Sequence, residues 1–112
     1  MASLNQSIKR GSAELAVLSV LEEGPRHGYE IARQIENGTD GVLRFTLASL
    51  YPLLYRMEKR GWTKAAWETT PAGVKRRCYR LTAAGSTQLA LSRREWNVFF
   101  RALDRLGGVR GA

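Results

Sequence analysis

One imidazole and one thiol are the most reactive side chains in this sequence. His27 and Cys78 are its single histidine and its single cysteine. They lie far apart in the chain, with no third member for a nucleophilic triad and no spacing typical of metal ligands. We therefore expect no catalytic residue, no metal and no cofactor. His27 should brace the start of a helix, and Cys78 should pack as a small apolar residue.

Cations form the second group of functional candidates, and they are concentrated. The chain of 112 residues has a net charge of +8. Nine basic and two acidic residues lie between Val42 and Leu81, so this segment holds seven of the eight excess charges; the basic residues are Arg44, Arg56, Lys59, Arg60, Lys64, Lys75, Arg76, Arg77 and Arg80. Such a surface attracts a polyanion, with nucleic acid ahead of anionic lipid. The number of charges alone fits a merely solvated surface equally well. The helices and strands that position these charges must decide between the two interpretations.

Composition and motifs exclude several classes of protein. The length suits one domain, and 44% hydrophobic with 25% charged residues is typical of a folded chain. One cysteine excludes an intrachain disulfide. The sequence has no carboxylate pair, metal cluster or phosphate-binding glycine loop, so we do not expect an enzyme. No apolar stretch could span a bilayer and no secretion signal begins the chain, so we expect a cytoplasmic protein without a membrane partner.

Helical signals dominate the first half of the chain. Ser12 can cap a helix through Glu23 that Gly24-Pro25 ends. After a short break over residues 24–28, a second helix carries Tyr29 and Ile35 and runs up to Asn37-Gly38. The turn-forming residues 37–41 follow, and 42–45 could be extended.

A third helix should have one buried apolar side and one exposed side that carries candidate binding residues. Thr46 caps it and Gly61 ends it, which places Pro52 in its early turns. At about 100° per residue, one side is apolar and predicted to be buried: Leu47, Leu50, Leu53, Leu54 and Met57. The opposite side carries Ala48, Pro52, Tyr55, Arg56 and Lys59, flanked by Ser49 and Tyr51.

The last part of the chain predicts a hairpin and a long helix. Residues 62–68 and 77–81 are strand candidates joined by a loop with a basic tip. Thr82 caps a helix through about Leu106, which Gly107-Gly108 ends. Its length, about 36 Å, exceeds what so small a domain can cover. An apolar seam interrupted by Ser92 therefore predicts pairing with the same helix of a second subunit through Leu89, Trp96, Phe99, Phe100, Leu103 and Leu106. The alternative is that the helix folds back on its own domain.

Three short helices followed by a two-stranded basic hairpin make up the winged helix-turn-helix arrangement, to which the final long helix is added. The fold class is thus mainly α with a small β-hairpin, with a DNA-binding domain over 11–81 and a dimerisation helix over 82–107 in one compact unit. Three segments then identify a resemblance: Gly24-Pro25-Arg26-His27-Gly28-Tyr29-Glu30-Ile31, the helix 49–58 (SLYPLLYRME), and Tyr79-Arg80-Leu81-Thr82-Ala83-Ala84-Gly85. In this order they resemble the PadR-type transcriptional regulators, specifically the small subgroup with one C-terminal helix. The chain departs from the family pattern at Cys78, commonly aromatic, in the wing (Gly73-Val74-Lys75-Arg76-Arg77), and at Thr46-Leu47-Ala48, commonly Ser-Pro-Gly.

Docking of such a fold on double-stranded DNA suggests a role for each exposed residue. Arg56 could pair with guanine and Ser49 could contact several bases. Thr46, Tyr51, Tyr55 and Lys59 are better phosphate ligands. Lys75, Arg76 and Arg77 lie in or beside the wing, where strand alternation should direct two of the three toward DNA.

The resulting hypothesis is a homodimeric, sequence-specific regulator, a repressor on a pseudo-palindromic operator. Trp96, Phe99 and Phe100 would simply pack in the dimer interface or would line a pocket for a planar aromatic effector that releases DNA. Two other classes remain open: a ligand- or drug-binding sensor with a secondary DNA role, and a winged-helix adaptor that binds protein or RNA.

Overall fold

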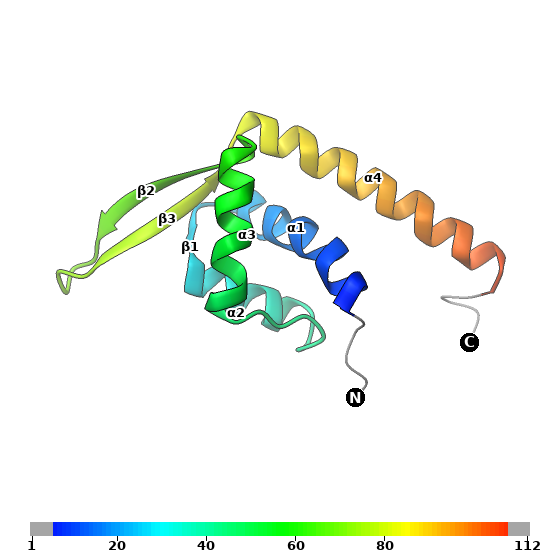
Figure 1. Cartoon of the computed structure of the whole chain (residues 1–112), viewed down its shortest axis with the longest axis horizontal. Coiled ribbons are helices and arrows are strands. Elements are labelled where there is room, and N and C mark those ends of the chain that lie inside the picture. The colour runs from blue at the N-terminus through cyan, green and yellow to red at the C-terminus, as the bar shows by residue number, and fades with distance from the viewer. Residues whose placement is uncertain (1–5, 108–112) are drawn as a thin grey trace.

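Four helices and three strands build the molecule (Figure 1). This computed structural model describes the backbone of residues 6–107 and the side chains of residues 12–107. The elements are, in order, α1 (Gln6–Glu22), β1 (Arg26–His27), α2 (Gly28–Gly38), α3 (Leu47–Lys59), β2 (Thr63–Thr69), β3 (Lys75–Leu81) and α4 (Ala83–Arg105). The predicted fold class, a winged helix-turn-helix followed by a long helix, is confirmed.

All four helices and one strand contribute to a single apolar core. Its buried members are Ala13, Val17, Leu18, Leu21, Ile31, Ile35, Leu50, Leu53, Leu54, Met57, Tyr79 and Leu89. The predicted buried side of α3 is confirmed except at Leu47, which is 37% exposed. Leu47 is the first residue of α3, where the helix has not yet reached the core. The core thus fixes α3 with its opposite side in solvent.

Local capping signals place both functional helices correctly. The Thr46 hydroxyl accepts a hydrogen bond from the backbone N–H of Ser49 at 3.1 Å, and Thr82 accepts one from Gly85 at 3.0 Å. Both predicted caps are confirmed. Because α3 begins at Leu47, Pro52 lies within the helix. It removes the hydrogen bond to the carbonyl of Ala48, on the exposed side.

Three predictions of local structure are wrong. Ser12 does not cap α1, because the helix already begins at Gln6 and runs through it. Residues 42–45 form no strand and instead connect α2 to α3. The break after α1 contains β1, which pairs with β3, so the sheet has three strands in the order β1-β3-β2. A two-residue strand has no periodicity of its own, and only its pairing partner reveals it.

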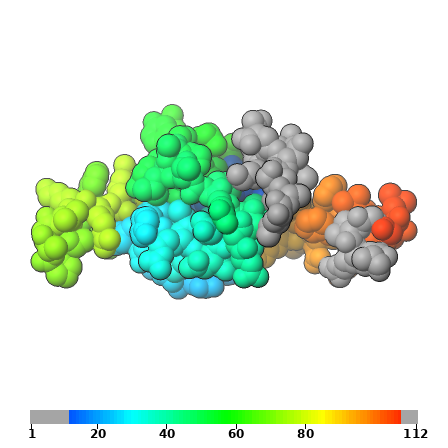
Figure 2. All heavy atoms as spheres, turned by 90° about the horizontal axis from the view of Figure 1, so that it is seen from below, coloured from blue at the N-terminus to red at the C-terminus, as the bar shows by residue number. Residues whose placement is uncertain are grey.

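The long helix α4 is anchored at one end and projects at the other. Gly85 lies against the Trp62 carbonyl, so closely that any side chain there would collide with it. Leu89 is buried in the core of its own domain. The prediction that Leu89 belongs to an interface with a second subunit is therefore wrong: the first turns of α4 pack on α1. Beyond them α4 extends past the domain, at the end opposite the hairpin (Figures 1 and 2). The helix ends at Arg105, followed by Gly107 at a φ of 72°; Gly108 lies outside the described residues.

None of the helices in the described part of the chain is long and apolar enough to cross a membrane.

Candidate nucleic-acid interface

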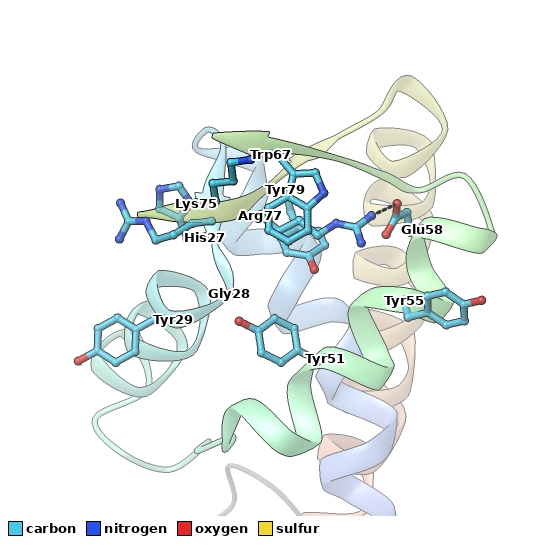
Figure 3. Close-up of a pocket in the computed structure, with 11 residues that line it drawn as sticks. His27, Gly28, Tyr29, Tyr51, Tyr55, Glu58, Trp67, Lys75, Arg77 and Tyr79 are labelled. Carbon is cyan, nitrogen blue, oxygen red and sulfur yellow. Dashed lines mark hydrogen bonds and ion pairs between the residues drawn. The ribbon is translucent and has the colours of Figure 1, made fainter. Parts of the chain in front are cut away.

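A groove of about 450 Å³ separates α3 from the hairpin β2–β3 (Figure 3). The start of α2 closes one end. The lining residues are His27, Gly28, Tyr29, Tyr51, Tyr55, Glu58, Trp67, Lys75, Arg76, Arg77 and Tyr79. Five of the nine residues predicted to bind DNA are among them: Tyr51, Tyr55, Lys75, Arg76 and Arg77. The fold thus brings α3 and the wing formed by β2 and β3 to one surface.

Aromatic rings give this groove its walls. Tyr55 on α3 and Trp67 on β2 are largely exposed, at 59% and 67%. Tyr51 lies against Gly28 at the start of α2, where a Cβ atom would come within 2.9 Å of its ring. A side chain at Gly28 would therefore not fit, and its absence lets α2 and α3 approach each other with Tyr51 between them.

An ion pair ties the wing to α3. The Arg77 guanidinium donates from Nη2 to Oε2 of Glu58 at 2.8 Å, as the dashed line in Figure 3 marks. Arg77 also lies over Trp67 and Tyr79, with its Cζ atom 5.9 and 6.0 Å from the ring centroids. Arg77 is half-buried. The structure therefore gives this predicted DNA ligand an internal partner and a positioning role between α3 and the wing.

The cations at the end of the wing are placed differently. Lys75 and Arg76 are exposed, and neither forms an ion pair with any residue the structure describes. The loop beside them is closed by a hydrogen bond from the Thr70 N–H to the Val74 carbonyl at 2.8 Å. Gly73 makes this turn possible at a φ of 82°. Lys75 and Arg76 are thus held at the start of β3, beside an ordered turn, with their charges free to meet an anion.

The outer side of α3 carries the other residues predicted to bind DNA. Arg56 and Lys59 are exposed in its last turn, and Lys59 Nζ lies 5.2 Å from the Tyr55 ring centroid. At the other end, the Thr46 hydroxyl donates to Ser49 Oγ, and the Ser49 hydroxyl donates to the Thr46 carbonyl. Thr46 and Ser49 are exposed, but the protons of both hydroxyls are already used in the cap. Their oxygens remain available as acceptors.

His27 and Cys78 meet in the sheet, which the sequence did not reveal. They are directly paired across β1 and β3. His27 is also the N-cap of α2, and its backbone N–H donates to the Glu30 carboxylate at 3.0 Å, so the expected role at the helix start is confirmed. Burial, together with the neighbouring Glu68 carboxylate, raises the pKa of the Cys78 thiol. Near neutral pH this residue is therefore a thiol.

An aromatic cluster marks the projecting half of α4. Trp96 meets Phe99 edge-on with ring centroids 5.8 Å apart, and Phe100 lies 5.5 Å from Trp96. A shallow hollow of about 230 Å³ lies beside Trp96 and Phe99. Further along the predicted seam, Leu103 is half-buried and Leu106 is 84% exposed. The aromatic side chains expected at an interface are thus grouped outside the domain core.

Sequence reasoning missed some residues of the groove. Trp67, Tyr29 and Glu58 were assigned no role, although all three line it. Period-two alternation along 63–69 could have placed Trp67 on the same face as buried Thr63 and so facing α3. Nothing in the sequence indicated that Glu58 would pair with Arg77, because that contact joins two elements.

Comparison with known proteins assigns the family. The profile of the transcriptional regulator PadR-like family matches residues 17–91. An uncharacterized protein of Lysinibacillus sphaericus is 32% identical over 93 residues, covering 83% of this chain and 85% of the relative. A transcriptional regulator from Clostridium thermocellum has a similar structure, with a TM-score of 0.81 and 28% identity over 89% of this chain and 97% of its own. A PadR family transcriptional regulator from Eggerthella lenta is also similar, with a TM-score of 0.79 and 26% identity over 93% of this chain and 88% of its own. With its three motifs, its groove and its wing in this arrangement, the chain belongs to the PadR-like family of transcriptional regulators.

Proposed function

We propose that this chain is a cytoplasmic, homodimeric repressor that binds a pseudo-palindromic operator. The observation that carries the proposal is the common groove, in which α3 and the basic wing form one surface. In helix-turn-helix docking the second helix of the motif enters the major groove of DNA. Here that helix is α3, whose outer side is polar and exposed while its inner side is locked into the core.

The residues divide into two kinds of contact. Lys59, Lys75 and Arg76 are exposed cations suited to phosphates, which fix position without reading sequence. Tyr51 and Tyr55 add hydroxyl groups along the same groove. Thr46 and Ser49, at the start of α3, can accept hydrogen bonds. Arg56 is exposed on α3, and its guanidinium group can bind guanine through two parallel hydrogen bonds.

Dimerisation is supported by the projecting half of α4. Phe99 on α4 and Leu106 directly after it are 51% and 84% exposed, and apolar residues grouped in this way mark an interaction surface. A second copy of α4 would cover them. The revised interface consists of Trp96, Phe99, Phe100, Leu103 and Leu106, without Leu89. A dimer joined there would direct two α3 helices at successive major grooves about 34–36 Å apart.

Selection of binding sites from random duplexes tests the whole proposal. The wild-type chain should enrich an inverted repeat with half-sites about one helical turn apart, and sedimentation should show a dimer. A charge-neutral change at the seam, Leu106→Ser, should weaken the dimer and lower affinity for the full site more than for a half-site. Enrichment of no motif, or of one without inverted symmetry by a monomeric chain, would overturn the proposal.

The role of Arg56 is tested separately. Arg56→Ala should reduce the ratio of specific to non-specific affinity, whereas Arg94→Ala, which removes an equally exposed arginine from α4, should leave the ratio unchanged. An equal loss on random DNA would reassign Arg56 to a phosphate.

A second function, release by a planar aromatic effector, is favoured by the hollow at Trp96 and Phe99. A pocket of about 230 Å³ in one subunit is small for a drug-sized molecule, so the partner subunit would have to complete it. Planar dyes should quench tryptophan fluorescence of the wild-type chain but not of Trp96→Phe, which retains Trp62 and Trp67. Equal quenching in both would remove this function from the proposal.

A further inference from the structure

The three-stranded sheet gathers side chains that the sequence separates. His27 on β1 pairs directly with Cys78 on β3, and Cys78 pairs on its other side with Ala66 on β2. Paired residues point to the same face of a sheet, and so do residues two apart on one strand. Glu68 is two residues after Ala66. His27, Cys78 and Glu68 therefore share one face, opposite to that of Arg77 and Tyr79.

Their polar atoms are close enough to share one ligand. One ligand atom from each of the three lies within 4.8 Å of the others. Nε2 of His27 is 3.8 Å from Oε1 of Glu68 and 3.8 Å from Oε1 of Glu30. These separations are too long for hydrogen bonds. Two ligands of one tetrahedral zinc ion lie about 3.4–3.6 Å apart, so small side-chain rotations would close the set.

The chemical types of the three groups specify the ion. Thiolate, imidazole and carboxylate are ligands of Zn²⁺, whereas Mg²⁺ and Ca²⁺ take oxygen ligands. With the thiol proton displaced, one thiolate and one carboxylate neutralise a divalent cation. Arg76 faces Glu68 across the strands, yet the structure shows no ion pair between them among its described residues, so the carboxylate is available.

We propose that His27, Glu68 and Cys78 form a binding site for a divalent transition-metal ion of the Zn²⁺ type, with Glu30 or water completing the coordination. The ion would join β1, at the start of α2, to both strands of the wing. Three protein ligands and one open position are a common zinc arrangement. The inference concerns the metal site alone and does not depend on whether the chain binds DNA.

Cobalt titration of the reduced, untagged full-length chain tests the site. His27 and Cys78 are the only imidazole and thiol in the sequence, so the spectrum has only one possible source of each ligand. Equimolar Co²⁺ should produce a thiolate-to-cobalt charge-transfer band and the intense visible bands of a tetrahedral ion, and Zn²⁺ should abolish both. Cys78→Ser should lose the charge-transfer band. His27→Gln and Glu68→Gln should weaken Co²⁺ binding at least about tenfold.

Matched controls make the outcome decisive. Glu36→Gln removes an exposed carboxylate from α2 at the same charge cost as Glu68→Gln and should bind Co²⁺ like the wild type. Zn²⁺, but not Mg²⁺, should slow alkylation of Cys78 in the wild-type chain, a readout that needs no variant to fold. Absence of the charge-transfer band, one ion bridging two chains, or equal affinities of Glu68→Gln and Glu36→Gln would each overturn the site.

Discussion

The double substitution Lys75→Ala with Arg76→Ala addresses the wing most directly. Both side chains are exposed at the start of β3 and neither is held by an ion pair within the described residues, so both can neutralise phosphates. Each phosphate contact contributes about 0.9 to the slope of log affinity against log salt. If the chain binds as the proposed dimer, two contacts in each of two subunits give a change of about 3.6. Between about 50 and 200 mM salt the ratio of wild-type to variant affinity should then fall about 150-fold.

Fluorescence anisotropy with one labelled duplex across a salt series measures this slope. The matched control, Arg94→Ala with Arg101→Ala, removes the same charge from two exposed residues on the side of α4 away from the aromatic cluster. Its slope should equal that of the wild type. The reasoning is refuted if the wing variant keeps the wild-type slope, or if the control variant changes by the same amount, since net charge would then explain the effect.

Three further predictions concern the groove and the core. Glu58→Gln releases Arg77 and leaves one more positive charge beside the groove, so the non-specific DNA affinity should rise in anisotropy titrations. Chemical denaturation should show a stability loss of no more than about 1 kcal/mol, because both side chains are partly exposed. Gly85→Ala should destabilise the fold by about 1–3 kcal/mol or more, because its methyl group would collide with the Trp62 carbonyl, whereas Gly38→Ala has open space and should be nearly neutral in the same assay. Burial raises the pKa of Tyr79, so the unfolded chain loses this phenolic proton first. The free energy of unfolding should therefore decline as the pH rises above 10.0, and Tyr79→Phe should reduce that decline in metal-free buffer. An unchanged pH profile in Tyr79→Phe would contradict the last prediction.

Much of the fold could be predicted from the sequence because its signals are local. Thr46 and Thr82 cap their helices through hydroxyl groups three residues from the N–H they bind, and Gly73 supplies the positive φ that the wing turn requires. The apolar spacing along α3 determined which of its sides is buried, and hence which residues face solvent. The same locality explains the error at Ser12, where the preference for a cap was overridden by the longer helix.

Contacts between elements were decided only by the tertiary structure. The sequence contained Leu89 in an apolar seam, but packing against α1 assigned that residue to the core and left Phe99 and Leu106 exposed. The sequence did not distinguish the three wing cations as DNA ligands, but the packing of α3 against the wing pairs Arg77 with Glu58. Strand pairing placed His27 beside Cys78. Spacing along a chain reports the period of a single element, whereas these outcomes depend on which elements meet and in what register, and no local pattern carries that information.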